Sequence, residues 1–203
     1  MMTVTNLSIK TRFPIIADFS YEFKSARIYA LIAVNGSGKT TVFRALTGLI
    51  PISSGKVKIL GQPLSEMKLA IFFYETSDWL DRHLTGMDYL RFVKSQWKSA
   101  VPLDAVLDTW QLHDFINLKI SKYSLGMKQK LLIAMYIASD AKVLIFDEIN
   151  NGLDAGSREL LYSQLFALKK AKKTIILASH YIEDVKDIAD HVLTLKDQKL
   201  YEE

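Results

Sequence analysis

The sequence predicts an α/β fold with a core of largely parallel strands, an antiparallel β portion near the N-terminus and an inserted helical block. Short apolar segments of strand character alternate with amphipathic helical segments along most of the 203 residues. One apolar segment, residues 27–32, leads directly into a glycine-rich turn that opens a helix. Helical periodicity alone prevails from about residue 77 to residue 140. Together these features are typical of a βαβ protein with an insertion.

Apolar spacing and turn residues place the elements in order along the chain. Before the helical block we expect strands at residues 4–10, 19–23, 27–32, 56–60 and 69–74, and a helix at residues 40–49. Within the block, one helical face is expected to carry Leu84, Met87, Leu90 and Val93. After the block we expect strands at residues 142–146, 174–178 and 191–195, and helices at residues 155–170 and 181–189.

The composition favours one soluble domain. A hydrophobic content of 49% over 203 residues is enough for one sizeable core. The chain has no cysteine, which excludes disulfides and thiolate metal sites and fits a reducing cytoplasm. The N-terminus has no basic-then-apolar signal segment, and the apolar runs are far shorter than the roughly 20 residues that span a bilayer. Any role at a membrane is therefore expected to come through a partner.

The positive charge of the chain is modest, at a net +4. Its densest cluster is Lys169-Lys170-Ala171-Lys172-Lys173, at the predicted end of a helix. Cations are favourable there because they interact with the negative end of the helix dipole. No aromatic platform for stacking bases accompanies the lysines. We therefore expect no nucleic-acid partner.

A predicted phosphate-binding loop occupies residues 33–41. Its sequence is Ala33-Val34-Asn35-Gly36-Ser37-Gly38-Lys39-Thr40-Thr41, which fits the pattern of Gly, four residues, Gly, Lys, then Ser or Thr, except at the first glycine. Gly36 and Gly38 let backbone N–H groups curl around phosphates. Lys39 supplies a positive charge for the terminal phosphates, and Thr40 offers its hydroxyl to Mg²⁺. We expect a nucleoside triphosphate and Mg²⁺ here, at the positive end of the following helix.

Ala33 stands where the first glycine is usual. If its backbone needs a positive φ, alanine costs about 1–2 kcal/mol relative to glycine. If its φ is negative, the cost is close to nothing. Either way the substitution is expected to change nucleotide affinity by about tenfold at most, since about 1.4 kcal/mol corresponds to a tenfold change in a binding constant.

A second motif is the apolar segment Val143-Leu144-Ile145-Phe146, which ends in Asp147 and Glu148. Asp147, at the end of a buried strand, is placed to contact the Mg²⁺ shell. Glu148, one residue later, can polarise a water that attacks the γ-phosphate. The pair therefore predicts hydrolysis as well as binding.

A third motif, Tyr123-Ser124-Leu125-Gly126-Met127-Lys128-Gln129, precedes a predicted helix. With the two motifs above, it makes the chain strongly resemble the ATP-binding cassette (ABC) family, whose signature is commonly Leu-Ser-Gly-Gly-Gln. The form found here resembles a variant of bacterial exporter subunits. Ser124 and the amide of Gly126 at a helix start form a second anion site.

The resemblance implies a P-loop NTPase fold in a single cassette domain over residues 1–203. A RecA-like core would comprise residues 1–75 and 141–203, and a helical subdomain would comprise about residues 76–140. In the family, two cassettes pair head to tail, and each ATP lies between the phosphate loop of one and the signature of the other. The implied partners are thus a second cassette, itself or a paralogue, and a membrane permease.

Four further site residues follow from the resemblance alone. Asp154 lies in Asn151-Gly152-Leu153-Asp154, which resembles the loop that crosses between cassettes. His180 resembles the switch histidine that contacts the γ-phosphate. Glu75 stands where many members carry glutamine and would contact Mg²⁺ or water. Phe13 is the candidate for stacking on adenine, although a core aromatic is the alternative.

The chain departs from the family pattern at Ala30, Ala33, Ile149 and Asn150, which replace glycine, glycine, proline and threonine. None of these changes removes a charge or hydroxyl that hydrolysis uses, so rate and affinity are in doubt more than mechanism. Lys39, Glu148 and His180 remain as the expected catalytic residues.

The predicted function is an ATPase subunit that drives a separate permease, with an exporter favoured over an importer. The resemblance implies that residues of about 76–92 contact the permease and hold the subunit at the inner face of the cell membrane. This segment contains several large apolar residues, some of which are expected to pack in the core of the helical subdomain: Trp79, Leu80, Leu84, Tyr89 and Phe92. Two alternatives remain at this stage: a soluble ABC ATPase without a transport role, and a nucleotide-binding regulator with little turnover.

Overall fold

The computed structural model describes residues 1–34, 36–179 and 185–203. Its larger sheet contains six strands: β3 (Arg27–Ile32), β6 (Ile71–Phe73), β7 (Val143–Asp147), β8 (Thr174–Ser179), β9 (His191–Lys196) and β10 (Lys199–Glu202). The strand order is β10-β9-β3-β8-β7-β6. From β9 to β6 neighbouring strands are parallel, whereas β10 and β9 form an antiparallel hairpin. The prediction of a largely parallel sheet is confirmed.

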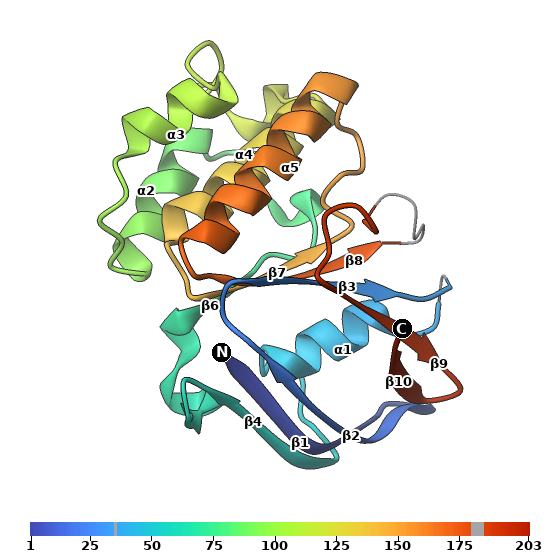
Figure 1. The fold of residues 1–203 in the computed structure, drawn as a ribbon. Coiled ribbons are helices and arrows are strands. Elements are labelled where there is room, and N and C mark those ends of the chain that lie inside the picture. Colours follow the sequence, from blue (N-terminus) through green and yellow to red (C-terminus); the bar gives the residue numbers. More distant parts are fainter. Residues whose placement is uncertain (35, 180–184) are drawn as a thin grey trace.

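The smaller sheet is antiparallel and lies near the N-terminus. It contains β1 (Met2–Lys10), β2 (Pro14–Phe23), β4 (Ser54–Ile59) and β5 (Gln62–Pro63), in the order β2-β1-β4-β5. Helix α1 (Lys39–Leu46) lies between the two sheets (Figure 1). Val42, Phe43 and Leu46 of this helix are buried in the apolar cluster that joins the sheets. The antiparallel β portion predicted from the sequence is thus confirmed.

On the opposite face of the larger sheet lie α4 (Leu125–Ser139) and α5 (Ala155–Lys170), and α2 (Gly86–Gln96) and α3 (Leu103–Trp110) pack against α4 (Figure 1). Strand β7 is buried on both of its faces. Val143 and Ile145 pack in the cluster around α1, while Leu144 and Phe146 pack in the cluster beneath the four helices. This arrangement explains why the strand reads as an unbroken apolar run, as strands of parallel sheets do.

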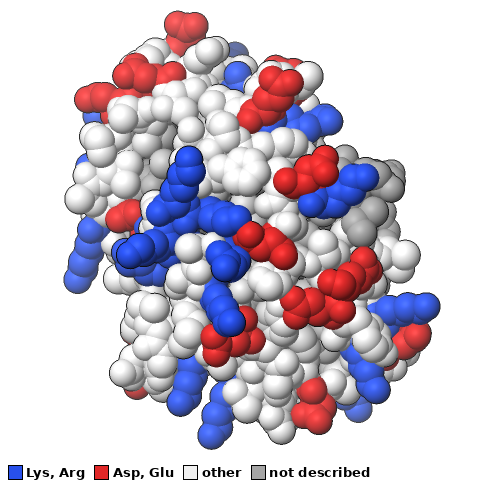
Figure 2. All heavy atoms as spheres, viewed as in Figure 1, with Lys and Arg blue, Asp and Glu red and all other residues white. Residues whose placement is uncertain are grey.

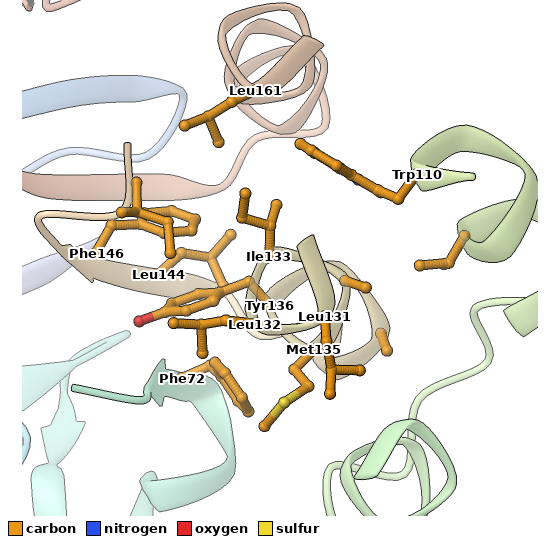
Figure 3. Close-up of a cluster of buried hydrophobic side chains, with 14 of the residues drawn as sticks. Phe72, Trp110, Leu131, Leu132, Ile133, Met135, Tyr136, Leu144, Phe146 and Leu161 are labelled. Carbon is orange, nitrogen blue, oxygen red and sulfur yellow. The ribbon is translucent and has the colours of Figure 1, made fainter. Parts of the chain in front are cut away.

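Helix α4 is the centre of the second cluster (Figure 3). The ring of Tyr136 stacks on Phe146 with centroids 4.1 Å apart and meets Phe72 edge-on at 4.8 Å. Its hydroxyl donates to the Ile145 carbonyl at 2.5 Å and accepts from the Tyr74 amide at 3.1 Å. One side chain therefore joins α4 to β6 and β7, the two strands whose ends carry acidic residues.

Several element boundaries differ from the predictions. The strand expected at residues 69–74 is limited to β6, because residues 68–70 form a 3₁₀ turn that follows another at residues 64–66. Further short 3₁₀ turns occupy residues 77–79 and 120–122. The helix expected at residues 181–189 lies partly outside the described residues, and residues 185–188 form a turn. The division into a core and a helical subdomain stays a prediction.

The lysine cluster lies where α5 ends, as predicted, and Figure 2 shows Lys and Arg side chains gathered on that face. Two of its lysines are paired: Lys169 contacts Asp190 at 2.5 Å, and the largely buried Lys173 contacts Asp140. Ion pairs and the helix terminus thus account for part of this charge. Among the described residues, no helix is both long enough and apolar enough to span a bilayer.

Candidate nucleotide-binding site

The phosphate loop lies between the end of β3 and the start of α1, at the carboxyl edge of the parallel sheet. Asn35 lies outside the described residues. Gly36 and Gly38 have φ angles of 77° and 102°, which L-residues rarely adopt. A Cβ atom on Gly38 would also lie 2.6 Å from the side chain of Ile15. Glycine at position 38 is therefore required by backbone conformation and by the close approach of β2.

Ala33 does not need the freedom of glycine. It is absent from the described residues with positive φ, and its side chain is buried in the cluster between the two sheets. Of the two conformations that the sequence left open, the structure has the one that costs alanine almost nothing.

Lys39 is the first residue of α1 and is almost fully buried. Its Nζ donates to the Ala33 carbonyl at 2.8 Å, so the ammonium is held against the loop. Burial lowers the pKa of Lys39, and the nearby Glu148 and Asp147 raise it in part. A poorly hydrated ammonium between loop carbonyls is suited to an anion such as a phosphate.

Thr40 and Asp147 meet at the ends of α1 and β7, where the threonine hydroxyl donates to Oδ2 of the carboxylate at 2.5 Å. The other oxygen, Oδ1, is buried and has no hydrogen-bond partner among the described residues. Burial raises the pKa of Asp147, the Thr40 bond lowers it, and Glu148 and Glu75 raise it further. An orphaned buried carboxylate oxygen is uncommon in native proteins. One carboxylate beside one hydroxyl is a donor set that fits Mg²⁺, which takes its remaining ligands from phosphates and water.

Glu148 follows directly after β7 and has a φ of 52°, in the left-handed region. Such a conformation is uncommon for a residue with a side chain and costs of order 1–3 kcal/mol. Its Oε2 accepts from Nδ2 of Asn151 at 3.0 Å. Together with Thr40 and Asp147, it lines a cavity of about 330 Å³. Glu148 thus lines the same cavity as the two residues of the predicted metal site.

Glu75 lies two residues beyond the end of β6 and lines the same cavity. Both of its oxygens are engaged: Oε2 accepts from Nε of Arg44 and Oε1 from Nη2 of Arg44, each at 2.5 Å. The predicted role of Glu75 as a metal ligand therefore stays a prediction, with Arg44 as a competing partner. Sequence reasoning missed Arg44. The available signal was its position four residues after Thr40, on the same helical face.

The signature segment opens α4, where Ser124 caps the helix by accepting from the Met127 amide at 3.2 Å. Gln129, one turn further, donates to the Ile149 carbonyl at 3.0 Å and so connects α4 to the residues after Glu148. A Cβ atom on Gly152 would lie 2.8 Å from Leu125, so the loop of residues 151–154 packs against the signature. Gln129 was also missed as a site residue.

The remaining predicted site residues are placed as follows. Asp154 caps α5, since its Oδ1 accepts from the Ser157 amide at 2.7 Å. Hydrogen bonds from the backbone and side chain of Ser157 lower the pKa of Asp154. Phe13 lies in the turn between β1 and β2, is 66% exposed, and has the Arg12 guanidinium 5.6 Å above its ring. Because most of the ring is exposed, the structure argues against the alternative that Phe13 is an aromatic of the core. His180 lies outside the described residues.

A strand-to-helix loop whose glycines need positive φ, with a carboxylate held against the threonine of that loop, defines a nucleotide-binding protein of the P-loop class. The chain belongs to the ABC transporter family, whose model matches residues 16–151. It is an ATP-binding subunit of that family, as its relatives indicate.

Two curated relatives illustrate the family membership. The chain is 34% identical to the ABC transporter ATP-binding protein YybJ of Bacillus subtilis, over 98% of this chain and 94% of the relative. It is 29% identical to the Nod factor export ATP-binding protein I of Sinorhizobium fredii, over 95% of this chain and 59% of that protein. Among solved structures, an ATP-binding subunit of an ABC transporter superposes with a TM-score of 0.92 at 22% identity, over all of this chain and 89% of that one. This last likeness concerns the fold.

Proposed function

We propose that the chain hydrolyses ATP in the presence of Mg²⁺ and that hydrolysis drives a separate membrane permease. The observation that carries the proposal is the group at the end of β7. There Asp147 is held by Thr40 and keeps one oxygen without a partner in the described part of the chain, and Glu148 lines the same cavity. Binding alone needs no second carboxylate, whereas hydrolysis needs a group that orients water.

In the proposed mechanism, the N–H groups of the phosphate loop and the Lys39 ammonium bind the terminal phosphates. Thr40 and Asp147 would hold Mg²⁺, which supplies electrostatic stabilisation for charge that develops on the transferred phosphoryl group. Glu148 accepts a hydrogen bond from the attacking water and polarises it. Asn151 restrains the glutamate in its position through the 3.0 Å bond to Oε2. His180 is proposed to contact the γ-phosphate.

The direct test compares the steady-state ATPase rates of the wild type and Glu148→Gln. We expect the variant to lose at least about a hundredfold in rate, the range for removal of a general base, while it still binds ATP. Equal, background-level rates in both proteins would contradict hydrolysis and favour the regulator alternative. A melting curve with and without MgATP shows whether each protein still binds the nucleotide.

Contact with a permease is proposed for residues of about 76–92. Trp79, Leu84 and Phe92 are exposed apolar side chains of this segment, whereas Leu80 is buried in the core beneath the helices. Exposed apolar side chains grouped in one segment are typical of an interaction surface. The subunit would thereby lie at the inner face of the membrane. The name of the Nod factor export relative supports export.

Co-purification with a co-expressed candidate permease tests the contact. We expect Trp79→Ala or Phe92→Ala to weaken assembly about tenfold or more, because a large aromatic at an interface contributes more than 1 kcal/mol. Tyr201→Ala is the matched control, since Tyr201 is 49% exposed and Trp79 is 50% exposed. Unchanged assembly for both aromatic variants would contradict this surface and favour the alternative of an ATPase without a transport role.

A further inference from the structure

One face of α1 holds two carboxylates from neighbouring strands. Thr40 and Arg44 are four residues apart and therefore lie on the same side of the helix. Thr40 donates to Asp147 at the end of β7, and Arg44 donates twice to Glu75 beyond the end of β6. Because β6 and β7 are adjacent and parallel, these two acids emerge side by side at the same edge of the sheet.

The cavity beside this face is rich in negative charge. Glu75, Asp147 and Glu148 all line it, together with the hydroxyl-bearing Thr40. A triphosphate is itself strongly negative, so each carboxylate without a compensating charge opposes its binding. The Lys39 ammonium donates to the Ala33 carbonyl, and the charges that raise its pKa are those of Glu148 and Asp147. The charge of Glu75 is balanced by Arg44, which donates to both of its oxygens.

The contact between Arg44 and Glu75 has the geometry of a strong pair. Two parallel N–H···O bonds of 2.5 Å use both carboxylate oxygens, an arrangement that lysine cannot reproduce. The Glu75 side chain is 13% exposed and that of Arg44 is 41% exposed, so the carboxylate is largely removed from water while the guanidinium reaches it from the surface. Without Arg44, Glu75 would be a poorly solvated anion facing the cavity.

We infer that Arg44 is a positioning residue: it holds Glu75 outside the metal shell and neutralises it, so that the cavity accepts the terminal phosphate with its Mg²⁺. The inference rests on the proposed function and deepens it. Removal of Arg44 releases a third carboxylate into the site. That carboxylate repels the triphosphate and offers an additional ligand to a bare divalent cation.

Calorimetric titration of MgATP into four proteins tests the inference: wild type, Arg44→Gln, Arg44→Gln with Glu75→Gln, and Arg91→Gln. We expect Arg44→Gln to bind MgATP about tenfold more weakly, the size of one partly screened charge interaction. The double variant is expected to recover to within about threefold of the wild type, because no uncompensated charge remains. Arg91→Gln loses the same charge at an exposed position of α2 and is expected to bind MgATP like the wild type.

A second readout uses Mn²⁺ alone, followed by electron paramagnetic resonance without nucleotide. We expect Arg44→Gln to bind Mn²⁺ several-fold more tightly than the wild type, since it adds one free carboxylate, and the double variant to lose this gain. If Arg44 merely fastened α1 to β6, the double variant would bind MgATP as weakly as Arg44→Gln and neither would gain Mn²⁺ affinity. That result would overturn the inference.

Two further outcomes keep the inference separate from the proposed function. A wild type that binds no MgATP would contradict the proposed function itself. A wild type that binds MgATP, with Arg44→Gln binding equally well, would overturn only the role of Arg44. Should Arg44→Gln fail to fold, Arg44→Lys keeps the charge but loses the paired bonds. This variant is expected to bind MgATP with intermediate affinity, and unchanged affinity would overturn the inference.

Discussion

At the residue scale, Ala33 in the phosphate loop and Glu148 after β7 are both unusual, but their backbones differ in the sign of φ. Ala33 replaces a glycine but has no positive φ, whereas Glu148 has a φ of 52° in spite of its side chain. The first departure is therefore harmless to the backbone, and the second stores strain beside the predicted attacking water. Departure from a family pattern and backbone strain are separate properties in this site.

The substitution Ala33→Gly tests the first of these statements. We expect it to lower the free energy of unfolding by about 1–2 kcal/mol, because it deletes a buried methyl group and adds backbone freedom to the unfolded chain. ATP affinity is expected to change by about tenfold at most. Urea unfolding and ATP titration measure the two effects.

Gly38→Ala is the contrasting variant, since its φ is 102° and its Cβ would meet Ile15. It is expected to impair both stability and binding. A thousandfold change in affinity for Ala33→Gly, or none for Gly38→Ala, would contradict this conformation of the loop.

At the element scale, the sequence predicted those features that depend on neighbouring residues. The glycine turn before a helix, the acids that end an apolar strand and the span of α5 are all local patterns, and they appear as predicted. Strand β10 was missed because it is short and polar, although its two-residue turn at Asp197-Gln198 has the positive φ angles of a hairpin. The Arg44–Glu75 pair was missed because the spacing of Thr40 and Arg44 shows only that they share a helical face, whereas the contact with Glu75 forms once α1 packs beside β6.

The junction of α5 with β3 gives a pH-dependent prediction. Asp190 accepts from the Ile28 amide at 2.8 Å and from Lys169 at 2.5 Å. Burial of Asp190 opposes its ionisation, but the bonds from Lys169 and Ile28 outweigh burial and lower its pKa. A lowered folded-state pKa stabilises the protein above the unfolded-state pKa of about 4, and this contribution is lost as the pH falls through the folded-state pKa.

Asp190→Asn is therefore expected to lower the free energy of unfolding by about 1 kcal/mol at pH 7. The difference from the wild type should shrink as the pH falls below about 4, where the unfolded-state carboxylate becomes protonated, and through the lowered folded-state pKa, where the native carboxylate follows. Urea unfolding across this pH range measures it. Asp114→Asn, at an exposed position, is the control. A difference that stays constant down to pH 2 would contradict the ionic origin of the effect.

At the scale of the whole molecule, the two predicted phosphate-binding surfaces carry exposed apolar side chains. Val34 in the phosphate loop is 78% exposed and Leu125 in the signature is 59% exposed. Ser124, next to Leu125 in the chain, and Asp154, in the loop whose Gly152 packs against Leu125, are exposed cap residues, so this surface combines polar and apolar groups. Such a composition suits an interface that forms reversibly. We propose that it receives the phosphate loop of a second cassette, a copy of this chain or a paralogue, with ATP between them.

The pairing is best tested in the Glu148→Gln background, where slow hydrolysis preserves ATP. We expect size-exclusion chromatography with light scattering to show a monomer without nucleotide and a dimer with MgATP, because contacts to the γ-phosphate across the interface exist only in the closed pair. Leu125→Asp in that background is expected to abolish the dimer, since it places a buried charge near the phosphates. Leu118→Asp is the matched control, because Leu118 is a comparably exposed leucine outside the signature. Dimers that persist in Leu125→Asp, or that also disappear in Leu118→Asp, would contradict head-to-tail pairing through this surface.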